Sequence, residues 1–417
     1  VRILLVGGGA REHALAWRIA RSPSLTKLWV APGNYGTARI AANLGVGSSV
    51  DTLVQAARDV RADLVVVGPE APLADGLVDA LSEFGIPAFG PTRAAAQLES
   101  SKSFARQIIR EANAPGPEFA VFTDESEALE YLRLNPGPRV VKADGLAAGK
   151  GVVAADAVRA SMSARAFGDA GATVLLEERL EGREVSVFAF CDGERLSPLV
   201  AACDYKRLED GDLGPNTGGM GSYSPPEFWT PELSGEVERT IMRPVIEAMA
   251  SRGTPYRGVL YAGLMLTVDG PKILEFNCRF GDPETQVLMP RLASDPLPAM
   301  LACAEGRLDP NSVAWDDRRC VGVVMASGGY PDRFATGKAI EGLDEFDARD
   351  TLVFCAGVAE GPGGGPVTSG GRVLTVVGEG NSLPEARERA YSRLAGITFH
   401  GAHRRTDIAA VGARVNA

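Results

Sequence analysis

The first hundred residues alternate short apolar runs with stretches that have helical spacing. The apolar runs read RILLVG, KLWVAPG, DLVVVGPE and PAFGP, and helical patterns begin near Glu12, Asp51 and Leu73. Short β-rich runs separated by helices are typical of a parallel, doubly wound sheet. We therefore predict an α/β domain over residues 1–98, which would bind ligands at the carboxyl ends of its strands.

Residues 99–318 carry a different pattern, in which β-rich runs come in pairs joined by glycine-containing turns. EVSVFAF-CDGER-LSPLV and VLYAGLMLT-VDG-PKILEFN both have the form of a hairpin. Helical spacing predicts helices at 102–112, 233–252 and 296–304. From residue 319 to 417, the runs CVGVVMAS, TLVFCAGV and RVLTVVGEG precede one helix, LPEARERAYSRLAGI. The predicted class is thus a multidomain protein of α/β and α+β type, with a small C-terminal α+β domain.

Length, charge and cysteine spacing narrow the classes of function. A chain of 417 residues is too long for one ordinary core. Its net charge of −10, without a basic cluster, argues against nucleic acid and favours small-molecule substrates. Six scattered cysteines suit a reducing cytosol, and no segment reaches the roughly 18 apolar residues of a membrane span. We expect a cytoplasmic protein with no membrane partner, and a monomer, with a dimer left open.

The stretch GLAAGKG, residues 145–151, is similar to a P-loop but lacks its spacing. Three residues instead of four separate its first two glycines, and Gly151 stands where a hydroxyl would hold magnesium. If this segment handles phosphate, the metal ligands must come from another part of the chain.

A second glycine cluster, Gly7-Gly8-Gly9, follows a predicted strand and opens a helix. Glu12 replaces the third glycine of a dinucleotide fingerprint, and the second strand ends at Asn34 without the acid that a ribose needs. This disfavours NAD and leaves either a tight turn or a helix N-terminus whose free N–H groups face one phosphate. Asn34 and the pair Pro69-Glu70 end neighbouring strands, and Glu70 is either a ligand contact or a surface carboxylate.

The densest candidate for chemistry is LEFNCRFGDPETQ, residues 274–286. Glu275 and Asn277 point to one face of a strand, because side chains alternate with period two. Two oxygen ligands suit magnesium, which keeps waters and phosphate oxygens in its other positions. Arg279 would continue this face and could clamp a transferring phosphoryl group. The alternative is a polar edge that faces solvent.

The pair His400 and His403 has the spacing of metal ligands but lacks an accompanying acid or cysteine, so it is more typical of structural histidines. Two other segments are weaker candidates for ligand binding. The apolar strand 173–176 ends in acids that could accept a ribose hydroxyl or could only be solvated. Residues 214–221, GPNTGGMG, form a loop whose backbone N–H groups could approach anionic oxygens, or a flexible linker.

Taken in order, these motifs resemble the phosphoribosylamine glycine ligase family of ATP-grasp enzymes over nearly the whole chain. The matching segments are GGGAREHALAW, PGNYGT, VGPEAPLADG, FGPT, VVKADGLAAGKGV, GPNTGGMGSYSP, LYAGLM, EFNCRFGDPETQ and GVVMASGGYP. The resemblance implies an N-terminal domain that binds phosphoribosylamine, an ATP-grasp domain with a mobile flap subdomain at about 115–185, and ATP with Mg²⁺ or Mn²⁺.

The resemblance also implies roles for individual residues. Glu275 and Asn277 would bind the metal, and Arg279 and Lys142 would be catalytic. The implied ATP-binding residues are Lys102, Lys142, Gly145, Gly149, Lys150, Gly151, Glu177, Glu178, Leu180 and Glu184. The implied substrate-binding residues are Gly8, Gly9, Asn34, Pro69, Glu70, Asp204, Lys206, Asn216, Thr217, Gly218, Gly219, Asp282, Pro283 and Glu284.

By the same resemblance, glycine and 5-phosphoribosylamine would be joined at the expense of ATP through glycyl phosphate. The sequence departs from the pattern in two places: Leu260–Leu266 lacks the extra acid of many ATP-grasp enzymes, and the segment after Gly151 is shorter than expected. An ATP-grasp ligase with another carboxylate, such as a carboxylase, is the main alternative. A nicotinamide oxidoreductase and a noncatalytic binding module are the others.

Overall fold

The computed structural model describes residues 1–137, 139–144 and 173–410. Its N-terminal part is a parallel sheet with the strand order β3-β2-β1-β4-β5, which confirms the predicted doubly wound arrangement. The strands are β1 (Arg2–Gly7), β2 (Lys27–Pro32), β3 (Ala42–Asn43), β4 (Leu64–Val67) and β5 (Ala88–Phe89). β1 is the central strand, and its residues Ile3, Leu4 and Leu5 are fully buried.

Helices connect these strands as the spacing predicts, with one difference. They are α1 (Ala10–Ile19), α2 (Val50–Asp59), α3 (Glu70–Ala74), α4 (Leu77–Ser82) and α5 (Arg93–Ser100). The single helix predicted from Leu73 is two short helices, because Gly76 between them has φ +89°, a left-handed conformation that interrupts a helix.

A nine-stranded sheet occupies the centre of the molecule, in the order β15-β14-β9-β10-β13-β16-β21-β18-β17. Both predicted hairpins are antiparallel pairs in it, β9 with β10 and β14 with β15. The strands are β9 (Arg183–Asp192), β10 (Val200–Asp204), β13 (Gly221–Ser224), β14 (Arg257–Thr267), β15 (Gly270–Asn277), β16 (Arg319–Ala326), β17 (Asp347–Ala348), β18 (Thr351–Cys355) and β21 (Arg372–Gly380). Two short hairpins lie outside it, β11 (Arg207–Glu209) with β12 (Leu213–Asn216) and β19 (Val358–Glu360) with β20 (Pro366–Thr368).

The central sheet continues across residue 318, where the sequence pattern changes. β13 pairs with β16 in antiparallel register, with Ser222 opposite Gly322. The C-terminal strands therefore extend the sheet instead of forming a separate one, because hydrogen bonds to β13 satisfy an edge that would otherwise be exposed.

Helices cover this sheet close to their predicted positions. They are α6 (Lys102–Glu111), α9 (Pro231–Val237), α10 (Arg243–Ser251), α11 (Glu284–Leu288), α12 (Pro296–Glu305) and α13 (Leu383–Ala395). The predicted helix 233–252 is α9 and α10 joined by a π-helical segment, η4 (Glu238–Met242). α13 packs on β21 and β16.

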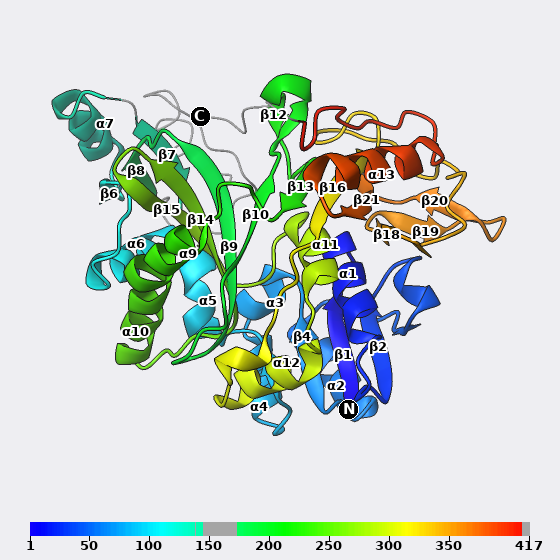
Figure 1. The fold of residues 1–417 in the computed structure, drawn as a ribbon. Helices are drawn as coiled ribbons and strands as arrows, with labels where there is room; N and C mark the ends of the chain where they lie inside the picture. Colours follow the sequence, from blue (N-terminus) through cyan, green and yellow to red (C-terminus); the bar gives the residue numbers. More distant parts are fainter. Residues whose placement is uncertain (138, 145–172, 411–417) are drawn as a thin grey trace.

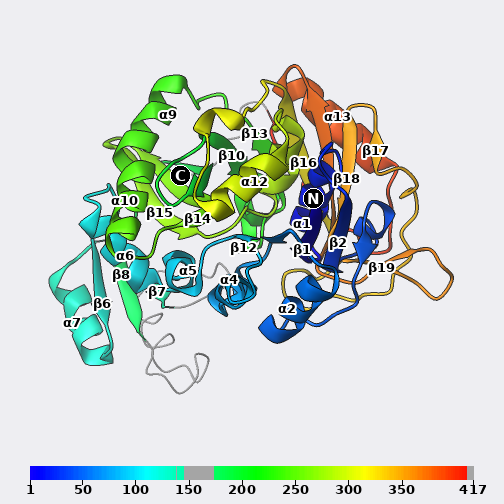
Figure 2. The ribbon, with the colours of Figure 1, turned by 90° about the horizontal axis from the view of Figure 1, so that it is seen from below.

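A three-stranded sheet forms a separate layer at one end of the molecule, in the order β6-β8-β7. It consists of β6 (Phe119–Phe122), β7 (Arg139–Ala143) and β8 (Val174–Glu178), with α7 (Glu125–Leu134) as its helix. Four buried residues form its own small apolar cluster: Ala128, Val141, Val174 and Leu176. Figures 1 and 2 show this layer at the end opposite to α13 and the C-terminal strands.

Within the described ranges, every helix is too short or too polar to cross a bilayer.

Candidate active site

Glu275 and Asn277 lie at the end of β15, on the face that does not enter the core. A β-bulge interrupts the pairing with β14, so that Gly263 faces Glu275 while Leu264 faces Ile273. Ile273 is buried, Glu275 is exposed and Asn277 is partly exposed. The bulge precedes Glu275, so the predicted alternation still places Glu275 and Asn277 on one face.

Cations surround Glu275. Desolvation by the surrounding protein raises the pKa of its carboxyl, but the charges of Lys206, Lys142 and Lys102, followed by Arg279, outweigh desolvation and lower the pKa overall. Glu275 is therefore ionised at neutral pH. A carboxylate that faces solvent among several cations is suited to share a divalent ion with phosphate oxygens.

The donor atoms at this strand fit such an ion. A carboxylate and an amide oxygen are hard ligands, the type that magnesium and manganese bind. Among the described residues, no three His, Cys, Asp or Glu side chains group so that they could hold a metal by themselves. The residues thus fit a cation that arrives with a nucleotide and completes its coordination with phosphate and water.

Lys102 is held at the start of α6 by contacts that the sequence did not suggest. The backbone N–H of Lys102 donates to Oδ1 of Asp144 at 2.6 Å, and the N–H of Ser103 donates to the same oxygen at 3.3 Å. Desolvation is the largest cause of a lowered pKa for Lys102. Asp144 directly follows β7, so it links the three-stranded layer to the first turn of α6.

The acids at the end of β8 and the start of β9 have different surroundings. Glu177 is only 2% exposed, because its carboxylate binds Arg106 and Lys142. Glu178 accepts from the backbone N–H of Glu118 at 3.3 Å. Glu184 binds Nζ of Lys206, and its side chain is 34% exposed. Of these acids, Glu184 is the one that combines solvent access with a position beside Lys206, whereas a ribose could reach the Glu177 carboxylate only by displacing a cation.

Leu180, another implied ATP-binding residue, lies two residues beyond the end of β8 and is 9% exposed.

Asp204 lies at the end of β10 near two other acids. Burial raises the pKa of its carboxyl to about 7; Lys206 lowers this pKa, and Glu284 and Glu184 raise it further. Glu284 is 3% exposed and accepts hydrogen bonds from Tyr261 at 2.8 Å and Ser186 at 3.1 Å. The sequence placed Asp204, Lys206 and Glu284 in one site, and the structure brings them together. Tyr261 and Ser186 were missed because they face inward from ordinary apolar strands.

The glycine-rich segment 214–221 begins as strand β12 and only then becomes the predicted loop. Asn216 pairs with Arg207 in the hairpin, and the hydroxyl of Thr217 donates to the carbonyl of Lys206 at 2.9 Å. A Cβ on Gly219 would lie 2.4 Å from Cδ of Pro283, so glycine is required for this close approach. The segment is therefore fixed against residues 282–284 and does not behave as a linker.

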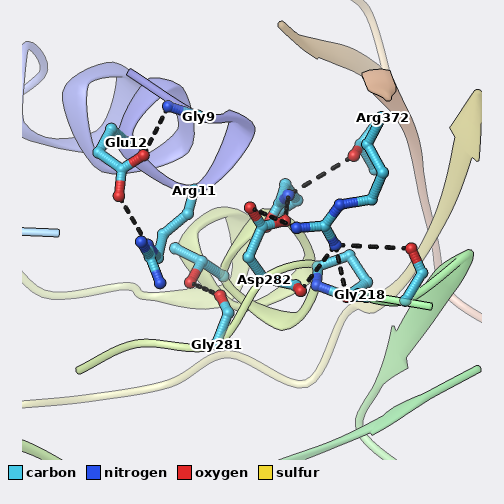
Figure 3. Close-up of polar contacts among 12 residues, drawn as sticks. Gly9, Arg11, Glu12, Gly218, Gly281, Asp282 and Arg372 are labelled. Atoms are coloured by element: carbon cyan, nitrogen blue, oxygen red, sulfur yellow. Dashed lines mark hydrogen bonds and ion pairs between the residues drawn. The ribbon is translucent and has the colours of Figure 1, made fainter. Parts of the chain in front are cut away.

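Arg372 at the start of β21 completes this contact (Figure 3). Its Nη1 donates to the carbonyls of Gly218 at 2.5 Å and Asp282 at 2.8 Å, and its Nη2 binds Oδ2 of Asp282 at 3.1 Å. Tyr330 accepts the N–H of Gly218 at 3.0 Å. Neither residue was predicted as part of the site; Arg372 follows two glycines at the start of a strand, which is a weak signal.

The N-terminal glycines meet a buried acid instead of an open helix end (Figure 3). Oε2 of Glu12 accepts the N–H of Gly9 at 2.6 Å, and Oε1 accepts from Arg11 at 2.6 Å. A Cβ on Gly68 would lie 2.2 Å from Oε1 of Glu12, so this carboxylate fills the space between the ends of β1 and β4. The N–H of Gly9 is thus not free, and this packing also disfavours a dinucleotide pyrophosphate.

Asn34 is occupied within the protein. Its Nδ2 donates to the carbonyls of Cys355 at 2.6 Å and Gly8 at 3.0 Å, and its Oδ1 accepts the N–H groups of Gly36 and Thr37 at 2.8 and 2.9 Å. These contacts connect the glycine turn to β18, so the side chain stabilises the position of the turn.

Glu70, which follows Pro69 at the start of α3, meets the predicted catalytic arginine. Nε of Arg279 donates to Glu70 at 3.1 Å, and its Nη2 donates to Glu99 at 2.7 Å. Arg279 lies beyond the end of β15, and its guanidinium bridges α3 and α5. Glu99 was missed, since a glutamate late in a helix has no distinctive pattern.

Four predicted residues, Gly145, Gly149, Lys150 and Gly151, and the short segment after them lie outside the described residues.

Residues 1–99, 100–285 and 320–411 match the phosphoribosylglycinamide synthetase N domain, ATP-grasp (A) domain and C domain, respectively. A phosphoribosylamine–glycine ligase of Allochromatium vinosum is 48% identical over 419 residues, with 98% of both chains covered. One of Caulobacter vibrioides is 49% identical over 414 residues, with 97% of both covered.

Solved structures agree with this assignment. The crystal structure of a phosphoribosylamine–glycine ligase from Thermotoga maritima has a TM-score of 0.85 and 33% identity, covering 98% of this chain and 100% of that one. A biotin carboxylase from Campylobacter jejuni has a TM-score of 0.74 at 15% identity, covering 98% and 94%, and shares the fold alone. With three domain matches in order and relatives near half identity over their full length, this chain belongs to the phosphoribosylglycinamide synthetase family of ATP-grasp ligases.

Proposed function

We propose that this protein ligates glycine to 5-phosphoribosylamine with ATP, which gives glycinamide ribonucleotide, ADP and phosphate. The observation that carries the proposal is the set of cations around Glu275, contributed by Lys102, Lys142 and Lys206. Phosphoryl transfer depends on positioning and charge neutralisation, which such a set supplies. The identity of the substrates rests on the names of the full-length relatives.

The chemistry explains why no protein nucleophile is needed. A carboxylate is a poor acyl donor, because its leaving group would be oxide. The carboxylate of glycine attacks the γ-phosphate of ATP, ADP leaves, and glycyl phosphate forms. The amine of phosphoribosylamine then attacks the acyl carbon and expels phosphate. Lys142 and Arg279 stabilise the phosphoryl charge, and Asp204, with its pKa near neutrality, accepts the proton of the attacking amine.

Glu275 and Asn277 would hold the divalent cation, Mg²⁺ or Mn²⁺. When bound, this cation supplies charge neutralisation at the phosphate oxygens. The chain's own part is to keep Glu275 ionised among the lysines and to present two oxygens on one strand face.

The N-terminal strand ends would receive phosphoribosylamine. Gly8 offers a backbone N–H group, whereas the N–H groups of Thr217, Gly218 and Gly219 already donate within the protein. Glu70 and Asp282 offer carboxylates to ribose hydroxyls. Since Gly9 already donates to Glu12, the phosphate would rest on the neighbouring donors instead. Adenine would lie against Leu180, with its ribose at Glu184. We also propose a cytoplasmic monomer without nucleic-acid partners.

An ADP-release assay with single omissions tests this function. Release should require ATP, glycine and phosphoribosylamine together, and the product should have the mass of glycinamide ribonucleotide. Glycine labelled with ¹⁸O in its carboxylate should transfer one label to inorganic phosphate, because the acyl phosphate breaks at the acyl carbon. ADP release that needs bicarbonate but not glycine would contradict the proposal, and unlabelled phosphate would exclude glycyl phosphate.

A further inference from the structure

The Glu177 carboxylate has both oxygens engaged inside the protein. Arg106 donates to Oε1 from Nε at 2.6 Å and to Oε2 from Nη2 at 2.8 Å. Nζ of Lys142 binds Oε2 at 2.7 Å. Lys142 lies on β7 opposite Leu175, and Val140 lies opposite Glu177, so both charged side chains share one face of the three-stranded sheet. The carboxylate therefore connects α6 to this sheet and has no oxygen left open.

Arg106 and Lys142 also form hydrogen bonds with β15, the strand that carries the candidate metal ligands. The carbonyl of Leu274 accepts from Nη2 of Arg106 at 2.7 Å and from Nζ of Lys142 at 3.3 Å. The carbonyl of Ile273 accepts from Nη1 of Arg106 at 3.4 Å. These residues flank the bulge, and the Leu274 carbonyl belongs to the peptide group that leads into Glu275. Holding this peptide plane sets the direction in which Glu275 leaves the strand.

The remaining donor of Lys142 has a defined direction. An ammonium group carries three N–H donors, and Glu177 and Leu274 accept two of them. Two fixed acceptors orient the tetrahedral group, and the Lys142 side chain, 19% exposed, retains contact with solvent. The protein therefore sets the direction of the third donor before any nucleotide arrives.

We propose that Glu177 and Arg106 are positioning residues: they orient Lys142 toward the nucleotide phosphate and fix the Leu274 peptide so that Glu275 faces the metal. This inference rests on the ATP use in the proposed function. In this proposal, Glu177 orients Lys142, and Glu184 is the acid that binds the ribose. The pair also couples two layers, because the lysine comes from the flap-bearing sheet and the metal ligand from the central sheet.

Nucleotide binding without turnover tests the first half of the proposal. In Glu177→Gln, affinity for ATP with Mg²⁺ should fall roughly ten- to hundredfold, the loss expected for a charged hydrogen bond. Affinity for adenosine should not change. The ratio of affinities for ATP and for its 2′-deoxy and 3′-deoxy analogues should also stay the same. Glu130→Gln on α7 of the same layer, where the side chain is 54% exposed, is the control and should bind all four ligands like the wild type.

Three outcomes of this titration would overturn the proposal. Loss of discrimination against a deoxy analogue would show that Glu177 reads the ribose. Equal loss for adenosine and ATP would show a general structural defect, and unchanged ATP affinity would show that Lys142 needs no orientation. Because binding is measured without glycine or phosphoribosylamine, these outcomes are independent of whether the ligase reaction is correct.

A mutant cycle separates positioning from mere packing. Lys142→Met should lose the same ATP affinity, and the double variant with Glu177→Gln should lose no more than Lys142→Met alone. Additive losses would contradict action through the lysine.

Arg106→Lys tests the second half of the proposal, that the Leu274 peptide is fixed so that Glu275 is oriented. Glu177→Gln could destabilise the fold because it leaves Arg106 as a buried unpaired cation. Arg106→Lys avoids this, since the buried charge pair is kept. Lysine keeps a positive charge beside Glu177 but cannot reach Glu177 and Leu274 together as the guanidinium fork does. We expect a thermal midpoint near that of the wild type. The Mg²⁺ concentration for half-maximal turnover should rise about tenfold, the lower end of the effect of losing a group that orients a metal ligand. An unchanged Mg²⁺ requirement would remove Arg106 from this role.

Discussion

Glu275 and Glu177 are both strand carboxylates near lysines, but their surroundings give them opposite uses. Glu275 is exposed at the end of β15 with cations around it, whereas Glu177 is enclosed by Arg106 and Lys142. A carboxylate that is already paired and buried cannot take a further ligand without an uncompensated charge. At the residue scale, pairing and burial therefore separate the candidate metal ligand, Glu275, from the proposed positioning residue, Glu177.

Glu275→Gln tests the metal assignment. Turnover should fall by at least about a hundredfold, since even a residue that only orients a metal ligand costs ten- to a hundredfold when removed. The thermal midpoint should stay close to that of the wild type, because the side chain is exposed. Steady-state rates over a Mg²⁺ and Mn²⁺ series provide the measurement, with Glu130→Gln, at an exposed side chain of α7, as control. Wild-type rates and metal dependence in Glu275→Gln would remove this residue from the site.

Asp204 predicts a pH dependence. Burial raises the pKa of its carboxyl to about 7, so below that pH the group is protonated and cannot accept a proton. The kcat/KM for the amine substrate should rise with pH through about 7 and then level off. Asp204→Asn should lose this limb and most of the rate. A pH–rate series from 5.5 to 9 with Glu209→Gln as control decides the matter, and an identical limb in Asp204→Asn would assign it to another group.

At the scale of elements, α1 is fixed to β18 by a buried histidine. Nδ1 of His13 accepts the N–H of Cys355 at 2.9 Å, and the imidazole lies against the rings of Phe346 and Phe354. Burial lowers the pKa of His13 to about 3, so the folded protein keeps it neutral. This contact joins the helix that follows the glycine turn to the C-terminal strands, and Asn34 strengthens the same junction through Cys355.

This histidine should make stability fall in mild acid. The pKa of His13 is lower in the folded state than its usual 6.5. The contribution is therefore complete above about pH 6.5 and is lost as pH falls toward 3. The free energy of unfolding should decrease by about 1.4 kcal/mol per pH unit below 6.5. Urea unfolding at pH 7.5 and pH 5 measures this difference.

His13→Gln removes the titration and is the comparison for that experiment. Its stability at pH 7.5 should be lower than that of the wild type, but its loss between pH 7.5 and pH 5 should be smaller by about 2 kcal/mol. An equal loss in both proteins would mean that other groups cause the pH dependence.

At the scale of the whole molecule, the candidate site is assembled from segments far apart in the sequence. The N-terminal turn, residues 281–282, Gly218 of the loop 214–221 and Arg372 at the start of β21 meet at one place (Figure 3). The continuous nine-stranded sheet allows this, because β16 and β21 extend from β13 and bring Arg372 beside Asp282. A C-terminal region separate from this sheet could not supply that arginine at a fixed position.

Arg372→Met tests this dependence on the C-terminal strands. Asp282 would lose its ion pair, and the carbonyl of Gly218 would lose its donor. We expect the KM for phosphoribosylamine to rise about tenfold or more, the cost of a charged hydrogen-bonded contact, while the Kd for ATP stays unchanged. Arg349→Met, at a side chain that is 95% exposed in the same region, is the control. A weakened ATP affinity with an unchanged KM would contradict the assignment.

The periodicity of the chain predicted the doubly wound sheet, both hairpins and most helices, because these depend on local spacing of apolar residues. It also predicted that Glu275 and Asn277 share a face, since the bulge precedes them. It failed where one residue interrupts an element, as Gly76 does between α3 and α4. Spacing alone could have placed Lys102 and Arg106, four residues apart in α6, on the same face of the helix. No local pattern marked Asp144 or Arg372 as residues of the site.

The sequence by itself determined the elements, the family and the kinds of group available for phosphate and metal. Only the tertiary structure decided which of those groups are already occupied. Asn34 and Glu177 form hydrogen bonds with other segments of the same protein. Glu12 accepts the N–H at the start of α1, and Arg279 bridges two helices. The physical reason is that hydrogen-bond partners and burial depend on residues distant in sequence, whereas side-chain periodicity depends only on adjacent ones.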